Sequence, residues 1–183
     1  MKKTNFIFLS SVLFSSACAQ AQIYLAQTCE ISFFSDGILE DIAAINSSAK
    51  PILNTTTSEI AVKVTIKSFD FEKELMEEHF NEKYLESDKY PHAIFQGKIQ
   101  ETIDYKKDGT HKVTVKGKLT IHGVEKERIL EGTITIKGGE ISFDCKFMVA
   151  LKDHNITIPS VVVQNIAEIV EVKIKSNLTE FKK

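Results

Sequence analysis

The chain has 183 residues, 43% of them hydrophobic, and carries 23 basic and 25 acidic side chains for a formal net charge of −2 at pH 7. This length fits one domain with a sizeable core. A mildly acidic chain with both signs of charge interspersed argues against a nucleic-acid partner, for which a basic patch is expected.

The N-terminus has the pattern of a secretory signal peptide. Lys2 and Lys3 precede an apolar stretch over residues 6–14, and small residues follow it. We therefore predict a signal peptide over residues 1–21 and a single exported domain over residues 22–183, periplasmic or secreted. The apolar stretch is shorter than the roughly 20 residues of a membrane span, so no stable membrane insertion is expected.

Cys18 leaves a second processing route open. It could become the lipidated first residue of a lipoprotein, but Ser15 stands where such signals usually have leucine. Anchoring through Cys18 is therefore the less favoured alternative.

Alternation of apolar and polar residues dominates the mature chain and predicts β-strands with one buried face. It is clear over residues 60–66, 113–121, 130–136 and 170–178. Residues 38–53 are less regular and suggest a strand that is broken near 47–51. Turn signals separate the alternating runs, namely Lys107-Asp108-Gly109, His122-Gly123 and Lys137-Gly138-Gly139.

One stretch changes period. Between residues 71 and 87 the apolar side chains recur at helical spacing, which predicts a single inserted α-helix with Asp70 as its N-cap. Pro91 disfavours helical geometry at Tyr90, so the helix should end before it and a strand should follow. A helix in an otherwise β protein must bury its apolar face, and the end of a barrel offers a place for it.

The count is about eight antiparallel strands and one helix, which could form a closed barrel or a sandwich. Gly97, Gly117 and Gly132 fall on inward positions, where they permit bending or leave space, and this favours the barrel. An eight-stranded barrel is just wide enough to be filled by side chains or to hold one small ligand.

Two cysteines remain in the mature chain, Cys29 and Cys145, both on apolar strand faces. In an up-and-down barrel they would lie on the first and the next-to-last strands, which are not neighbours. We therefore favour two buried thiols over a disulfide.

Three separated blocks closely resemble the YceI-like family of bacterial lipid-binding barrels: HFNEKYLESDKYPHAIFQG at 79–97, VTVKGKLTIHGVEKE at 113–127 and KFMVALKDHNITIP at 146–159. The resemblance covers about residues 27–180. It implies a lipocalin-like antiparallel barrel that holds a long isoprenoid or similar amphiphile, and it does not imply catalysis.

With this resemblance, the inward apolar side chains become candidate ligand contacts rather than plain core. The predicted lumen residues are Phe33, Val62, Val64, Ile66, Phe69, Phe71, Met76, Phe80, Tyr84, Phe95, Leu119, Ile121, Phe143, Phe147, Val149, Val170 and Val172. A polar head group would sit at the mouth, where Tyr84, Tyr90, His79 and His122 could offer hydrogen bonds.

No catalytic constellation is evident. There is no Gly-x-Ser-x-Gly context around a nucleophile, and the histidines lack the spacing of a zinc site. Asp153 matches an aspartate of the family, and we expect it to bond to backbone at a strand turn. The sequence thus predicts no enzyme, no metal and no cofactor, although a bound isoprenoid or fatty-acyl lipid fits.

The favoured hypothesis is an exported, non-enzymatic carrier or sequestering protein for a long-chain apolar ligand of the polyisoprenoid type. Two alternatives stay open: a filled barrel acting through its surface in the cell envelope, and an accessory of membrane electron transfer that handles a quinone. The sequence also leaves a homodimer open.

Overall fold

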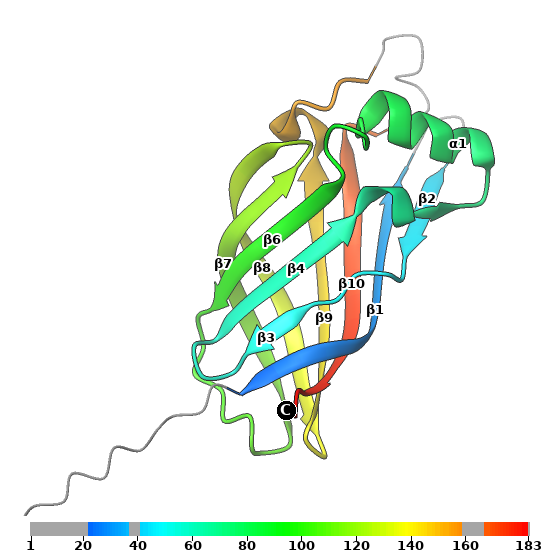
Figure 1. Cartoon of the computed structure of the whole chain (residues 1–183). Coiled ribbons are helices and arrows are strands. Elements are labelled where there is room, and N and C mark those ends of the chain that lie inside the picture. Colours follow the sequence, from blue (N-terminus) through cyan, green and yellow to red (C-terminus); the bar gives the residue numbers. More distant parts are fainter. Residues whose placement is uncertain (1–21, 37–40, 159–166, 183) are drawn as a thin grey trace, which may run out of the picture.

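The computed structural model describes residues 22–36, 41–158 and 167–182, so the predicted signal peptide and Cys18 lie outside it. Ten strand segments form one sheet that curls into a barrel (Figure 1). The segments are β1 (Ile23–Ser35), β2 (Ile42–Asn46), β3 (Ile52–Asn54), β4 (Glu59–Thr65), β5 (Asp70–Phe71), β6 (His92–Ile99), β7 (Gly109–Ile121), β8 (Val124–Lys137), β9 (Glu140–Ala150) and β10 (Ile169–Glu180).

Antiparallel pairing of β1 with β10 closes the barrel, with Ile31 opposite Ile174. β2 and β3 both pair with β1 and form one interrupted strand, as the irregular pattern before Leu53 predicts. β5 pairs with β2, while β4 pairs with β3 and β6, so β4 and β5 form a second interrupted strand. Counted in this way, the ten segments make the predicted eight-stranded antiparallel barrel.

The inserted helix lies across one end of the barrel (Figure 1). It consists of α1 (Glu74–His79) and a π-helical turn, η2 (Phe80–Tyr84), which together are called the lid below. The predicted N-cap is wrong, because Lys73 holds that position and Asp70 belongs to β5. Backbone pairing of β5 with β2 keeps the chain extended before the helix begins.

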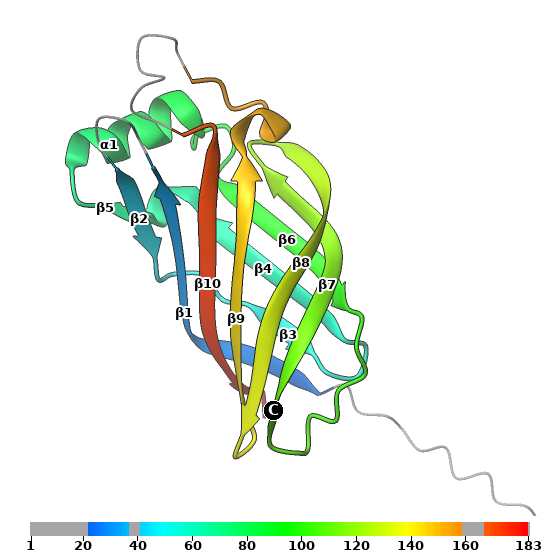
Figure 2. The same cartoon turned by 180° about the vertical axis from the view of Figure 1, so that it is seen from behind.

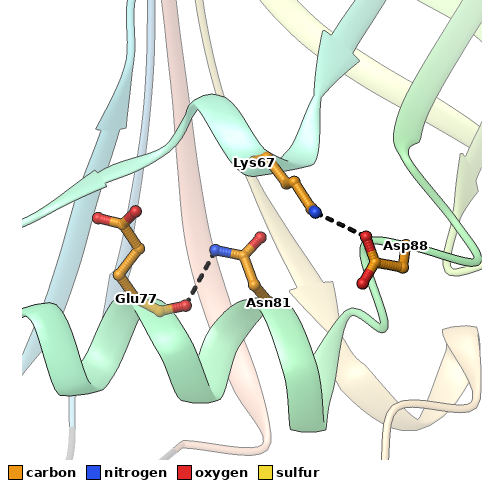
Figure 3. A network of polar contacts seen from close by, with 4 residues as sticks. All are labelled: Lys67, Glu77, Asn81 and Asp88. Carbon is orange, nitrogen blue, oxygen red and sulfur yellow. Dashed lines mark hydrogen bonds and ion pairs between the residues drawn. The ribbon is translucent and has the colours of Figure 1, made fainter.

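The lid is also shorter than predicted, and its second half changes geometry. The Leu85 N–H donates to the Phe80 carbonyl oxygen at 2.9 Å, a bond five residues long that defines a π-turn. The Asn81 side chain donates to the Glu77 carbonyl oxygen at 3.0 Å, and Lys67 pairs with Asp88 at 2.6 Å (Figure 3). These contacts lie along the second half of the lid and directly after it.

Gly97 and Gly117 allow two neighbouring strands to approach each other closely. A Cβ on Gly117 would lie 2.3 Å from the Gln96 carbonyl oxygen and 2.6 Å from the Gly97 Cα. The two glycines face each other across β6 and β7, so they allow close approach of the strands. Of the two roles expected for these glycines, bending or lumen space, the structure favours a backbone role, because neither Gly97 nor Gly117 lines the cavity described below.

β8 and β9 separate toward the end that bears the lid. They pair only between Gly132–Cys145 and Lys137–Glu140, and Figure 2 shows them diverging beyond that point. A short 3-10 helix, η3 (Leu151–His154), packs against β8 there. The His154 ring lies 3.0 Å from the Val124 carbonyl oxygen, and Arg128 pairs with Asp153 at 3.3 Å.

Asp153 therefore does not bond to backbone as expected, since its described contact is the ion pair with Arg128. The family motif around it is used to hold η3 against β8. This matters for the site, because η3 and the chain that follows it replace β8 as a wall of the barrel interior.

Candidate functional site

The barrel contains a cavity of about 390 Å³ beneath the lid, partly open to the surface. This volume lies within the roughly 300–1,000 Å³ of typical small-molecule sites. Its wall includes side chains of β1, β4, β6, β7, β9 and β10, together with the lid and the region of η3. No residue of β8 contributes, and Leu151 and Ile156 stand in its place.

The predicted lumen residues gather in this cavity with one exception. Those that line it are Phe33, Val62, Val64, Ile66, Phe69, Phe71, Met76, Phe80, Tyr84, Phe95, Leu119, Ile121, Phe147, Val149, Val170 and Val172. Phe143 does not. It is buried lower on β9, opposite Ile134 and Ser176, where the barrel is filled by side chains.

Several lining residues were missed by the sequence analysis. Ile31 and Ile174 follow the same alternation as Phe33 and Val172, so the pattern could have found them. Leu85, Leu151 and Ile156 lie outside regular strands, and only the tertiary structure brings them to the wall.

Aromatic packing attaches the lid to the barrel. The Phe80 ring lies 5.4 Å from Phe33, 5.6 Å from Phe69 and 5.0 Å from Phe71, measured between centroids. Such pairs contribute about 0.5–1.5 kcal/mol each beyond the burial of their area. Phe80 is therefore the main apolar anchor of the lid, and its ring also forms part of the cavity wall.

Polar side chains are few in the cavity. Apart from apolar residues, the described wall contains only Ser35, His79 and Tyr84. The Ser35 hydroxyl oxygen accepts a hydrogen bond from the Ala167 N–H at 2.9 Å. Burial raises the pKa of the Tyr84 phenol, so this side chain stays a neutral hydrogen-bonding group.

A second contact holds the chain that follows the lid. His122, only 10% exposed, places Nε2 at 2.7 Å from the Glu86 carboxylate and Nδ1 at 3.2 Å from the His154 carbonyl oxygen. The Tyr90 ring packs edge-on against the imidazole with centroids 4.5 Å apart. We call Glu86, His122 and Tyr90 the latch.

Of the four residues predicted to contact a polar head group, two line the cavity and two do not. His79 and Tyr84 line the cavity, whereas Tyr90 and His122 lie outside its wall and contact each other. His122 adopts a positive φ of 52° in the tight turn between β7 and β8, which aims its ring at the chain after the lid. The predicted turn at His122-Gly123 is confirmed.

The two cysteines are free and buried, as favoured from the sequence. Cys29 lies opposite Ser176 and Cys145 opposite Ile174, so β10 separates the strands that carry them. Burial raises the pKa of each thiol to about 11, which leaves both protonated and unreactive at neutral pH.

Within the described residues, no cluster of three or more His, Cys, Asp and Glu side chains could hold a metal ion. Nor does the described part of the chain include a helix long and apolar enough to cross a membrane.

A comparison with models of protein families shows which family the chain belongs to. Residues 34–178 match the model of the YceI-like domain. The chain belongs to the YceI-like family. The match spans most of the barrel, including the lid, the latch and η3.

Solved structures share the YceI-like fold at low sequence identity. A polyisoprenoid-binding domain from Saccharophagus degradans has a TM-score of 0.75 at 13% identity, covering 88% of this chain and 100% of that one. BcnA of Burkholderia cenocepacia has a TM-score of 0.68 at 18% identity, covering 81% and 95%. The Campylobacter jejuni YCEI protein has a TM-score of 0.54 at 16% identity, covering 100% and 92%. No curated protein matches the chain.

Proposed function

We propose that this YceI-like protein is an exported, non-enzymatic binding protein that holds a long-chain apolar ligand, a polyisoprenoid or similar amphiphile, in the barrel cavity. The observation that carries the proposal is the cavity of about 390 Å³ with an almost wholly apolar wall. The name of the Saccharophagus degradans domain, a polyisoprenoid-binding domain of the same fold, supports the ligand class.

The physical chemistry of the wall suits a hydrocarbon chain. Each methylene moved from water into such a site gains about 0.8 kcal/mol, so a chain of even moderate length binds through burial alone. Phenylalanine and β-branched side chains offer no directional polar contacts that would select a compact polar molecule. A flexible apolar chain can adapt to the irregular wall, whereas a reaction would need positioned acid, base or nucleophilic groups.

Export rests on the N-terminal pattern. The residues that carry it are Lys2, Lys3 and the apolar stretch 6–14. A carrier with a covered cavity would protect an apolar molecule from water in an aqueous compartment outside the cytoplasm.

The test is native mass spectrometry of the processed protein, purified without detergent from a lipid-containing host, followed by organic extraction. We expect a stoichiometric added mass that extraction identifies as a prenyl or acyl chain. If the protein shows only the mass of its own chain and takes up no added isoprenoid or fatty acid, the proposal is overturned and a barrel that acts through its surface is favoured.

A matched pair of variants on β9 tests whether the bound mass lies in the cavity. Val149→Trp places a large ring into the cavity and should abolish the added mass. Met148→Trp makes the same addition at the next residue, which is 51% exposed on the outer face, and should leave the added mass unchanged.

A further inference from the structure

We infer that the head group of the bound amphiphile is uncharged, and that the protein discriminates against anionic lipids such as prenyl diphosphates and ionised fatty acids. This inference rests on the proposed function, because it assigns the chemical class of the ligand held in the same cavity. Three independent features of the described chain carry it: the cavity wall, the ion pairs around it and the charge of the lid.

The cavity wall offers no counter-charge. Among the described residues that line it there is no Asp, Glu, Lys or Arg. An ionised group drawn into such a wall would lose its hydration without gaining a partner, which is strongly unfavourable. A diphosphate or carboxylate would therefore have to stay outside the cavity.

Four basic side chains of the barrel, Lys67, Arg128, Lys146 and Lys173, already have acidic partners. Lys67 pairs with Asp88 at 2.6 Å, as Figure 3 shows, and Arg128 pairs with Asp153 at 3.3 Å. Lys146 and Lys173 both contact Glu171, at 2.5 and 3.0 Å. An anionic head group would have to compete with these carboxylates for each cation.

The lid adds negative charge at the end of the barrel that covers the cavity. Between Glu74 and Tyr84 the chain carries four glutamates, Glu74, Glu77, Glu78 and Glu82, against one lysine, Lys83. Glu74, Glu78 and Glu82 are exposed, and none of the described ion pairs includes them. Charges of this kind repel an anion over roughly 8–10 Å at moderate ionic strength.

What the site does offer is neutral hydrogen bonding. His79 and Tyr84 line the cavity on the lid, and no described hydrogen bond occupies either side chain. An imidazole and a phenol can both donate and accept, which suits a hydroxyl, a carbonyl or an ester. The head group would then lie beneath the lid while the hydrocarbon chain extends into the barrel.

Binding of farnesol and farnesyl diphosphate tests the inference, since the two share one tail and differ in head charge. The full chain is processed by its host and stripped of endogenous lipid. Binding is measured by competition with a fluorescent prenyl probe. We expect farnesol to bind at least about tenfold more tightly than the diphosphate, and the difference to shrink as salt is raised.

A charge reversal on the lid makes the test specific. Glu78→Lys should strengthen diphosphate binding several-fold and leave farnesol binding unchanged. Glu140→Lys makes the same change at the β8–β9 hairpin, at the opposite end of the barrel, and should change neither.

The outcomes separate the inference from the proposed function. Diphosphate binding as tight as farnesol binding, whatever the effect of Glu78→Lys, overturns the uncharged head group but leaves a carrier. Binding of neither molecule, nor of the probe, overturns the carrier itself.

Discussion

The barrel has two halves built from the same strands but packed in different ways. Away from the lid, Val115, Ile134, Ile136, Ile141 and Leu178 are each at most 2% exposed and fill the interior. Beneath the lid, the same alternation along β7, β9 and β10 lines a cavity. We call these the closed half and the hollow half. Inward apolar residues therefore do not by themselves distinguish a core from a binding site.

The difference follows from what covers each half. In the closed half β8 pairs with β9, and inward side chains from both contribute to the core. In the hollow half β8 turns away, and the wall is completed by η3 and the lid, which are attached by a few contacts. The closed half should supply the stability, and the hollow half should supply the function.

The largest expected effect separates two buried leucines, Leu178 at 1% and Leu119 at 6% exposure. Leu178→Ala in the closed half leaves a cavity in tight packing and should cost about 2–5 kcal/mol of unfolding free energy. Leu119→Ala enlarges a cavity that already exists, so it should cost clearly less. Urea unfolding of the lipid-free protein measures both, and equal losses would contradict the division into halves.

Overpacking gives the next contrast, along β7. Val115→Trp adds volume to the closed half and should destabilise the protein by about 1–3 kcal/mol. Leu119→Trp adds it to the hollow half, where the cavity can accept the ring; stability should be retained and ligand binding lost. Thermal unfolding and lipid uptake, measured on the same samples, report the two effects. A Leu119→Trp protein that unfolds as readily as Val115→Trp would mean that the cavity is closed in solution.

Acid should weaken the hollow half first. Burial lowers the pKa of His154 below its ordinary value of 6.5, so the unfolded chain binds this proton more readily than the folded chain. Stability from this group is therefore full above pH 6.5 and falls as the pH drops toward the lowered pKa. Hydrogen exchange of η3 should increase over this window. His154→Gln should remove the dependence, and a dependence that persists would assign it to another group.

The smallest effect concerns the latch. His122→Asn removes the ring that contacts Glu86, while Asn tolerates the positive φ at this position. Because Glu86 is 44% exposed, we expect a loss of about 1 kcal/mol or less. Hydrogen exchange at Leu85 and Ser87 should rise several-fold, with strand amides of the closed half unchanged. A uniform rise across the barrel would show that the latch acts on global stability instead.

The sequence predicted most of the architecture because strand alternation is a local property. It gave the eight strands, the break before Leu53, the inserted helix and the buried free cysteines. It also placed the wall residues of the strands, since period two identifies the inward face once the barrel is closed.

The alternation of apolar and polar residues could not show where along the barrel the filled interior ends and the cavity begins. Phe143 and Phe147 share a strand face, yet only Phe147 lines the cavity, because β8 leaves β9 between them. Nor could it assign Asp153 to Arg128 or His122 to Glu86, which are distant in sequence. The sequence by itself determined which side chains point inward. The tertiary structure decided which of them meet other side chains and which face empty space, because that depends on strand divergence and on the seating of the lid.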